Sequence, residues 1–355
     1  MTGTVLLGAV GETRGQVAAK RDAAVSIGAR VQAQFEANGD SNTPASFFIR
    51  RAWVTMDGRY NDFASGRVQF DAQGQTVLEG YLQMDFSDAF QVQFGQFKKA
   101  VSHFWLVANS DLPIIERDAR VPGAADCPGV GGVCSFGRLT GRLGLDNYEP
   151  GLLFQGQLGG SASYRVTLTN GQGISGSGGT AGYDQNDGKS VSGQLSVDVG
   201  GGTRVSGYLA LDENEVVRDM EAMTTETLGS NAFGVEVEMG SWLGGPHLLA
   251  NLLAGDNWMV SDDARFTAFQ VLGLWYFPVE GSSSFQAVEP MLRVSWASTD
   301  SESMDMESTE MTGLAITPGI MFYASGRNGI SVNLDVYNAD GETRTSLKVQ
   351  AFAIF

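Results

Sequence analysis

The sequence predicts an all-β protein, folded as a transmembrane antiparallel β-barrel of 16 strands. Three observations predict this fold. Apolar and polar residues alternate with a period of two over much of the 355-residue chain. The segments with this pattern are mostly about 10–14 residues long, which suits a tilted membrane crossing. Their connections alternate between short and long, as short periplasmic turns and long external loops do. A soluble β-sandwich would accept the alternation but has no reason to keep this order of connections.

The composition excludes several other classes of protein. Hydrophobic residues make up 43% of the chain and charged residues only 18%, which does not fit a disordered protein. The formal net charge of −17 argues against a nucleic-acid partner, because such binding needs clustered Lys and Arg. No run of eighteen or more apolar residues is present, so we expect no transmembrane helix.

Each strand is predicted from the same two-sided pattern. In the first strand, Val25 and Ile27 lie on the apolar face, and Arg30 and Gln32 lie on the polar face. The last strand ends on Phe355, a terminal aromatic residue like those of outer-membrane barrels. The predicted strands are 24–37, 46–57, 63–72, 76–87, 89–98, 150–158, 161–170, 189–199, 203–212, 229–239, 246–257, 264–277, 285–298, 312–323, 329–338 and 345–355.

The connections predict the orientation of the barrel. The short ones, expected as periplasmic turns, are 58–62, 87–89, 159–161, 200–202, 240–245, 278–284 and 324–328. The long ones, expected as external loops, include 99–149, 171–188, 213–228 and 299–311. Both termini are therefore predicted to be periplasmic. Aromatic residues mark both edges of the membrane, for example Trp242 and Trp275 near short turns and Trp258 and Trp296 near long loops.

Two segments stay outside this pattern. Residues 1–23 precede the barrel, which is predicted to span 24–355, and contain an apolar stretch without the basic residues of a secretory signal. They are interpreted as a signal remnant, a mis-set start, or an ordered plug or tail. Cys127 and Cys134 lie in a Gly-rich segment with a spacing unlike that of redox or zinc motifs. A disulfide that closes a small loop in an oxidising compartment fits better, with two free thiols as the alternative.

Three parts of the chain resemble the phosphate-selective porin O and P family of Gram-negative outer membranes. They are 48–53 (FIRRAW), 94–102 (FGQFKKAVS) with 112–117 (LPIIER), and 164–171 (YRVTLTNG). The resemblance is clearest over 25–173. It implies a sixteen-stranded barrel in the outer membrane, a homotrimer, and a third loop, here 99–149, folded into the lumen as a constriction. Ala100 stands where a proline is common in the family.

The chain departs from the family in the residues that select phosphate. Phosphate-selective members carry a run of arginines along the channel, whereas residues 203–218 contain only Arg204 and Arg218. The external segments 212–227 and 299–311 are strongly acidic instead. Phosphate specificity is therefore not expected to carry over.

Charged residues that line the lumen are the candidate functional residues, because a channel selects by its diameter and its wall charges. The candidates either lie on the polar face of a predicted strand or belong to the expected constriction loop. Arg50 and Arg51 are neighbours on a strand, so only one of them is expected to face inward. We expect Arg30, Arg50 or Arg51, Lys98 and Lys99 to form an anion-attracting zone. Alternatively, these charges pair with wall acids and hold the loop. The candidates are Arg30, Arg50, Arg51, Arg67, Lys98, Lys99, Glu116, Arg117, Arg165 and Arg204.

No cofactor is expected, with one conditional exception in an acidic loop. Asp300, Glu302, Asp305 and Glu307 could bind Ca²⁺ weakly and bridge to lipopolysaccharide phosphates, since Ca²⁺ prefers carboxylate oxygens. Alternatively, this loop is simply solvated.

The sequence thus predicts a porin for passive diffusion of small hydrophilic solutes or ions, with anions as candidate solutes. An enzyme is not expected, because no nucleophile motif is present and the two histidines lie far apart in the chain. One alternative is a plugged structural or surface-interaction barrel without transport. A weaker one is a soluble acidic β-domain.

Overall fold

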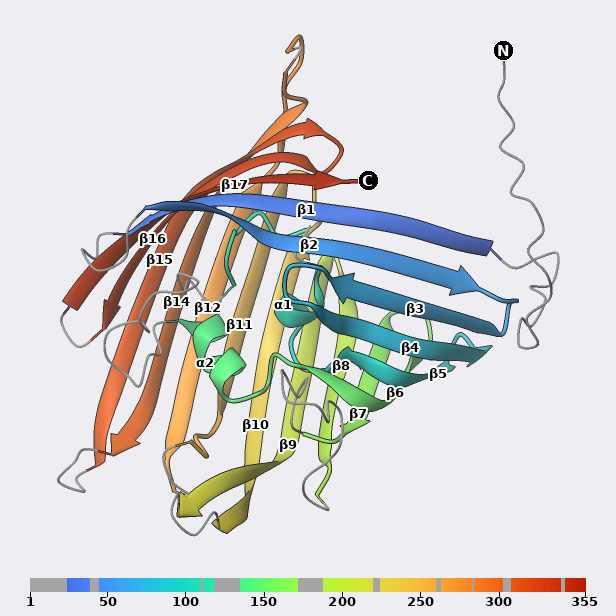
Figure 1. Cartoon of the computed structure of the whole chain (residues 1–355), viewed down its shortest axis with the longest axis vertical. Helices are drawn as coiled ribbons and strands as arrows, with labels where there is room; N and C mark the ends of the chain where they lie inside the picture. The colour runs from blue at the N-terminus through green and yellow to red at the C-terminus, as the bar shows by residue number, and fades with distance from the viewer. Residues whose placement is uncertain are drawn as a thin grey trace.

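The computed structural model describes residues 24–38, 45–108, 111–117, 135–171, 188–219, 224–259, 263–282, 284–302, 308–339 and 342–355. Its strands form one closed barrel (Figure 1). Those of the first half are β1 (Ala24–Asn38), β2 (Ser46–Arg59), β3 (Ala64–Asp71), β4 (Thr76–Ser87), β5 (Phe90–Lys98), β6 (Tyr148–Leu158), β7 (Ala162–Thr169) and β8 (Ser190–Gly200). Those of the second half are β9 (Thr203–Asp219), β10 (Thr224–Gly240), β11 (Pro246–Asp256), β12 (Arg265–Trp275), β13 (Phe277–Pro278), β14 (Ala287–Glu302), β15 (Ser308–Ser325), β16 (Asn328–Ala339) and β17 (Glu342–Ile354).

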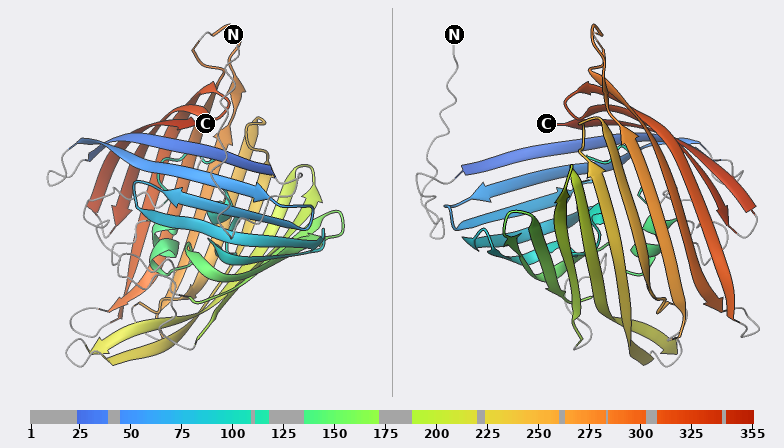
Figure 2. Two further views of the ribbon diagram at one scale, coloured as in Figure 1. Left: turned by 45° about the vertical axis from the view of Figure 1, so that its right-hand side comes forward. Right: turned by 180° about the vertical axis from the view of Figure 1, so that it is seen from behind.

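Every pair of neighbouring strands is antiparallel, and β1 pairs with β17 to close the barrel. The two-residue β13 continues β12 after a break at Tyr276, and both pair with β14. The barrel therefore has sixteen strands, which confirms the predicted fold class and strand number. Figure 2 shows from two further sides how the sheet curves around until β1 lies beside β17.

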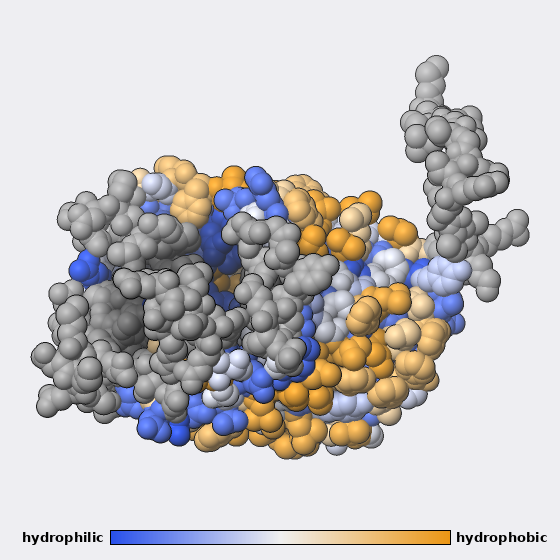
Figure 3. All heavy atoms as spheres, turned by 60° about the horizontal axis from the view of Figure 1, so that its bottom comes forward, coloured by the Kyte–Doolittle hydropathy of each residue, from blue (hydrophilic) through white to orange (hydrophobic). Residues whose placement is uncertain are grey.

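The two faces of the sheet separate polar from apolar side chains as the period of two predicts. Phe94, Leu209 and Phe233 project outward and are 63%, 44% and 65% exposed. Gln34 and Ser192, in contrast, face the lumen and are buried. Figure 3 shows hydrophobic residues over the outer wall and hydrophilic residues around the hollow that faces the viewer. An apolar exterior with a polar interior suits a barrel surrounded by lipid.

Two acidic connections differ from the prediction. The expected loops 213–228 and 299–311 are largely strand, because β9 runs to Asp219, β10 starts at Thr224, β14 runs to Glu302 and β15 starts at Ser308. Pairing continues beyond the apolar belt because a polar sequence can still form a β-ladder in water. The acidic residues therefore stand on long hairpins.

The connection between β5 and β6 contains two short helices, α1 (His103–Leu106) and α2 (Phe136–Arg142), which the sequence analysis did not place. Both pack inside the barrel, against an apolar part of its inner wall formed by strands β9 to β14. No helix in the described part of the chain is long and apolar enough to cross a membrane.

The two faces of β4 provide a test of the fold. Leu82 is 50% exposed on the outer wall, whereas its neighbour Gln83 faces the lumen and contacts Asp85 and Gln93. Leu82→Arg is expected to lower the free energy of unfolding by about 2–4 kcal/mol, because an Arg side chain at mid-depth faces apolar surroundings. Gln83→Arg is the matched control and should cost much less. Urea titration of both variants in liposomes measures the difference; equal losses would contradict the assigned faces.

Candidate functional site

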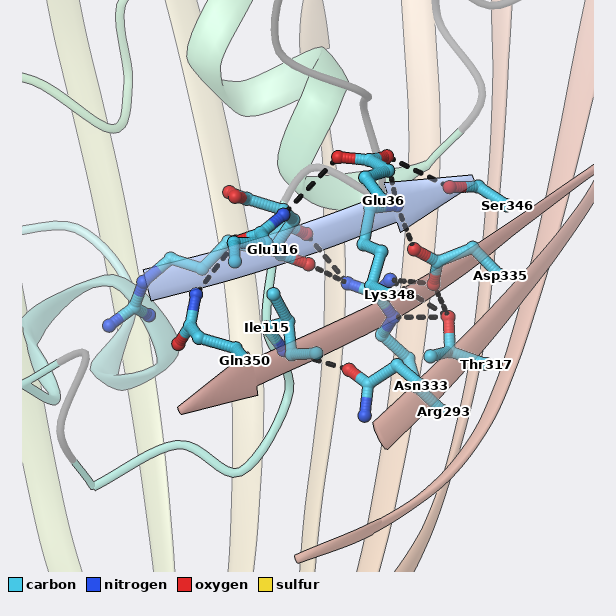
Figure 4. Close-up of polar contacts among 12 residues, drawn as sticks. Glu36, Ile115, Glu116, Arg293, Thr317, Asn333, Asp335, Ser346, Lys348 and Gln350 are labelled. Atoms are coloured by element: carbon cyan, nitrogen blue, oxygen red, sulfur yellow. Dashed lines mark hydrogen bonds and ion pairs between the residues drawn. The ribbon is translucent and has the colours of Figure 1, made fainter. Parts of the chain in front are cut away.

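The described parts of the segment 99–149 lie inside the lumen, held by backbone contacts to the wall. Ser331 Oγ donates a hydrogen bond to the carbonyl oxygen of Pro113 (2.7 Å), and the backbone N–H of Ile115 donates to Asn333 Oδ1 (2.8 Å). Arg293 Nη1 donates to the carbonyl oxygens of Glu116 (3.0 Å) and Arg117 (2.8 Å). Figure 4 shows Ile115 beside Asn333, and Glu116 near Arg293, where the loop meets the wall. The wall therefore fixes the path of residues 113–117.

A buried carboxylate completes this anchor. Glu116 accepts a hydrogen bond from Arg50 Nε (2.6 Å) and another from Arg51 Nη2 (3.3 Å), and its side chain is 2% exposed. Burial alone would raise the pKa of Glu116, but Arg51 and Arg50 outweigh it and hold the pKa at about 2. Glu116 is therefore ionised at neutral pH.

Both arginines reach Glu116 because of a β-bulge. Arg51 pairs with Gln32 and Ile49 pairs with Ala33, which leaves Arg50 as the extra residue between them. A bulge breaks the alternation of faces at one position. The expectation that only one of Arg50 and Arg51 faces the lumen is therefore wrong, since both bind the same loop carboxylate.

A second ionic network lies at the seam where the barrel closes. Arg293 Nη2 is 3.1 Å from Asp335 Oδ1, Lys348 contacts the same carboxylate, and Lys348 Nζ is 3.5 Å from Glu36 Oε1. Arg293 and Lys348 are fully buried. These two bases thus join β14, β16, β17 and β1 to one another beneath the loop, and they do not face a solute.

Lys98 and Lys99 also hold the loop. Lys99 Nζ lies 2.7 Å from Asp212 Oδ1 and 3.9 Å from Glu149 Oε1, and the side chain is 1% exposed. Lys98 Nζ donates to the carbonyl oxygens of Trp105 (2.9 Å) and Val107 (3.1 Å) and so caps α1. The geometry of these lysines fits the loop-holding alternative rather than the anion-attracting zone.

The loop buries its apolar side chains on one half of the lumen. Phe104 and Phe136, from α1 and α2, pack in a cluster with Leu249, Leu272 and other wall residues of β9 to β14. Arg117 lies over the Phe104 ring at 5.2 Å, and burial lowers the pKa of Arg117 to about 9. Contacts among apolar groups exclude water, so this half of the lumen is filled.

The opposite half, along β1 to β9, keeps accessible charges. Arg67 is bound to Asp57 (2.7 Å) and Glu79 (3.3 Å), and its side chain is 37% exposed. Arg204 binds Asp198 (2.8 Å) and is 41% exposed. One hollow of about 440 Å³ is lined by Asp57, Arg67, Tyr81 and Asp85, and a second of about 310 Å³ by Asp198, Arg204, Glu238 and Trp242.

Two further bases on this side have donors without an acceptor. Arg30 Nε and Nη1, and Arg165 Nε, make no hydrogen bond within the described ranges. The Arg30 guanidinium instead lies 4.7 Å from the centre of the Trp53 ring. Arg67 and Arg204 thus keep exposed side chains, whereas Arg30 and Arg165 are half-buried and have donors that the described wall does not use.

Sequence reasoning missed Ser331 and Asn333 as loop anchors. Their signal was present, because the period of two places them on the same face as Asp335 in the strand 329–338. What the pattern lacked was the position of the loop backbone, to which both side chains bind.

Three sequence expectations, among them the interpretation of residues 1–23, lie wholly or partly outside the described residues. Cys127 and Cys134 are outside them, as are Asp305, Glu307 and the side chain of Glu302. Asp300 is described, and its Oδ2 accepts a hydrogen bond from the backbone N–H of Arg265 (2.7 Å). Among the residues that the structure describes, no group of three or more His, Cys, Asp or Glu has a metal-binding arrangement.

The low pKa of Glu116 predicts how the loop anchor responds to pH. A depressed carboxyl pKa stabilises the anchor above the ordinary value of about 4.3 and loses that contribution as the pH falls toward 2. Amide hydrogen exchange of 111–117, corrected for intrinsic rates, should therefore stay slow down to about pH 4 and rise below it. Glu116→Gln should exchange faster at pH 7, whereas the exposed control Glu280→Gln should not; equal rates in the two variants would contradict the anchor.

Solved structures with the same architecture are outer-membrane proteins. The OmpF porin of Salmonella typhi in complex with daunomycin aligns with a TM-score of 0.61 and 10% identity over 93% of this chain and 97% of that chain. An anion-selective porin from Comamonas acidovorans aligns with a TM-score of 0.60 and 12% identity over 94% of this chain and 100% of that chain. OmpT of Vibrio cholerae in a trimer form aligns with a TM-score of 0.57 and 11% identity over 93% of this chain and 99% of that chain. At such identities these likenesses show the fold.

The family is shown by the sequence itself. The sequence model of phosphate-selective porin O and P matches residues 25–240, which is more than half of the chain. No curated protein sequence matches the chain significantly. With its closed sixteen-stranded barrel and charged lumen, the chain belongs to the phosphate-selective porin O and P family and is a passive channel of the outer membrane.

Proposed function

We propose that small hydrophilic solutes and ions cross the barrel along its β1 to β9 side, where the wall bases favour anions. The observation that carries this proposal is the asymmetric filling of the lumen. The loop covers the β9 to β14 wall with apolar contacts, while Arg67 and Arg204 face hollows on the other side. A water-filled path bordered by charges passes polar solutes and disfavours apolar ones.

The preference for anions is expected to be modest. Asp57, Glu79 and Asp198 compensate Arg67 and Arg204, so the excess positive charge comes from Arg30 and Arg165, for which the structure records no carboxylate partner. The acidic hairpins raise the local cation concentration at one mouth by electrostatic focusing, which opposes the anion preference. Phosphate specificity is not part of the proposal, because the arginine run of the phosphate-selective members is missing.

Charge removal tests the anion path. Arg165→Gln and Arg30→Gln should each lower the Cl⁻/K⁺ permeability ratio by about twofold, because a lumen charge acts over about one Debye length. The control is Arg265→Gln, since Arg265 lies at the outer end of β12 with a 61% exposed side chain. Reversal potentials across a planar bilayer under a KCl gradient give the ratios. The proposed path would be contradicted if the control lowered the Cl⁻/K⁺ permeability ratio as much as the lumen variants do, or if the lumen variants left the ratio unchanged.

We further propose that the protein is a homotrimer joined along the wall of β3 to β7. Strands β3 and β7 have 8 residues, whereas β9, β10 and β15 have 17 or 18. Eight residues tilted by about 40° span roughly 20 Å, less than the hydrocarbon thickness of about 30 Å. A protein neighbour would cover this low wall. The trimer form of Vibrio cholerae OmpT supports this assembly.

A matched pair of aromatic residues tests the trimer. Phe94 on β5 and Phe233 on β10 are both outward-facing and 63% and 65% exposed in the single chain. Native mass spectrometry of the detergent complex should give about three times the mass of one chain. Phe94→Ala should lower the temperature at which the trimer dissociates, and Phe233→Ala should leave it nearly unchanged. A monomer, or the reverse order of the two variants, would contradict the interface.

We also propose an orientation and surroundings for the barrel. We place the short turns, Ala24 and Phe355 on the periplasmic side, and the acidic hairpins outside, next to lipopolysaccharide. The backbones of Ala29 and Phe355 are hydrogen-bonded to each other, so the start and the end of the barrel lie at the same rim. Divalent cations held by the hairpins would bridge to lipid phosphates.

A further inference from the structure

The only two histidines of the chain meet at one carboxylate. His103, at the start of α1, places Nε2 3.5 Å from Glu238 Oε2, and His247 on β11 places Nε2 2.9 Å from Glu238 Oε1. His103 comes from the inward-folded loop, whereas Glu238 and His247 belong to the wall. This cluster, His103–Glu238–His247, thus joins the loop to the wall through groups that can change charge near neutral pH.

The cluster borders the accessible side of the lumen. Glu238 lines the 310 Å³ hollow together with Asp198, Arg204 and Trp242. The side chain of His103 is 26% exposed, whereas that of His247 is 1% exposed and lies against the Trp242 ring at 4.0 Å between centres. A change of charge at His103 would therefore act on ions in the hollow.

The charged groups packed around the cluster come from several elements. Arg204 on β9 lies 3.9 Å from Glu238 and is paired with Asp198 on β8. Arg165 on β7 acts on His103 through its charge, and Glu289 on β14 interacts with His247. Glu236 on β10 accepts a hydrogen bond from the backbone N–H of Phe104 (3.2 Å). Since Arg204 and Asp198 compensate each other, the charge at the hollow depends on Glu238 and on the protonation of His103.

We propose that His103, Glu238 and His247 are specificity-determining residues that switch the ion preference of the channel with pH. With His103 neutral, Glu238 gives the wall of the hollow a charge of about −1; protonation of His103 offsets that charge. Acidification therefore offsets the negative charge of Glu238 at the wall of the hollow and strengthens the preference of the path for anions. This inference rests on the proposed ion path along β1 to β9 and deepens it.

The position of His103 sets the direction of the switch. Burial lowers the pKa of His103, and the nearby Glu238 carboxylate only partly offsets this effect. A lowered imidazole pKa leaves His103 neutral at pH 7 and protonated only below the ordinary value of about 6.5. The change in ion preference should thus occur on the acidic side of neutrality.

Asp146 in the loop could titrate in the same range and must be separated from the cluster. Burial raises the pKa of Asp146 to about 6. The hydrogen bond that Thr140 Oγ1 donates to Asp146 (2.5 Å) lowers the pKa and offsets only part of this rise. Asp146 follows α2 in the loop. Its protonation would also make the lumen more positive on acidification, so Asp146→Asn is the matched control.

The experiment measures the reversal potential of the detergent-purified, full-length channel in a planar bilayer under a KCl gradient at pH 7.5 and pH 5. We expect the Cl⁻/K⁺ permeability ratio to rise by about twofold at pH 5, because the charge of His103 changes within about a Debye length of the path. The double variant His103→Gln/His247→Gln should show no such rise, whereas Asp146→Asn should keep it. Glu238→Gln should move the midpoint to lower pH, because the neutral amide no longer favours the imidazolium forms.

The outcomes separate this inference from the channel itself. A rise that persists in the double histidine variant, or disappears in Asp146→Asn, would overturn the assignment to the cluster. A wild-type ratio that is independent of pH would overturn the inference and leave the channel intact. Absence of conductance at both pH values would overturn the proposed ion path as well. Heat-shifted gel migration of each variant verifies that its barrel is folded.

Discussion

The closure of β1 onto β17 is the constraint on which the rest of the structure depends. Inside a hydrocarbon layer no water can satisfy backbone N–H and C=O groups, so a spanning sheet must have no free edge. The register Arg30 to Ile354 through Asn38 to Ser346 removes that edge. Closure then sends the apolar side of every strand outward and encloses a polar space. It also brings Glu36 and Lys348 together from opposite ends of the chain, where they stabilise the seam.

The enclosed space is divided unevenly, and the proposed solute path depends on this division. Lumen walls are ordinarily polar, but β9 to β14 carry apolar side chains such as Leu249 and Leu272 on their inner face. Exposure of these apolar side chains to water would be unfavourable. Because α1 and α2 cover them, they form a small hydrophobic core inside the barrel. The ionic contacts of Glu116 and Lys99 hold the loop in register with that core. In the described part of the chain, the charged wall on the other side is not covered by this core.

Much of the fold could be predicted from the sequence, because a period of two is a local property that survives in each strand. The number of strands, the faces of Arg30 and Gln34, and the alternation of turn lengths all depend on neighbouring residues alone. The site was less accessible to such reasoning. The bulge at Arg50 breaks parity at one residue, and the partners of Lys98 and Lys99 depend on where a long connection packs. The meeting of His103 and His247 depends on the same packing.

The distribution of charge explains how an acidic protein can still present a basic path. The net charge of −17 is a sum over the whole chain, whereas an ion in the lumen responds to charges within about one Debye length, roughly 10 Å at 0.1 M salt. Acids inside the barrel are largely used in pairs, as Glu116 with Arg50 and Asp198 with Arg204. Arg30 and Arg165 have donors outside such pairs. In the proposed path, the acidic hairpins act on the concentration of ions at the mouth, while these donors and the histidine cluster act on the preference farther inside.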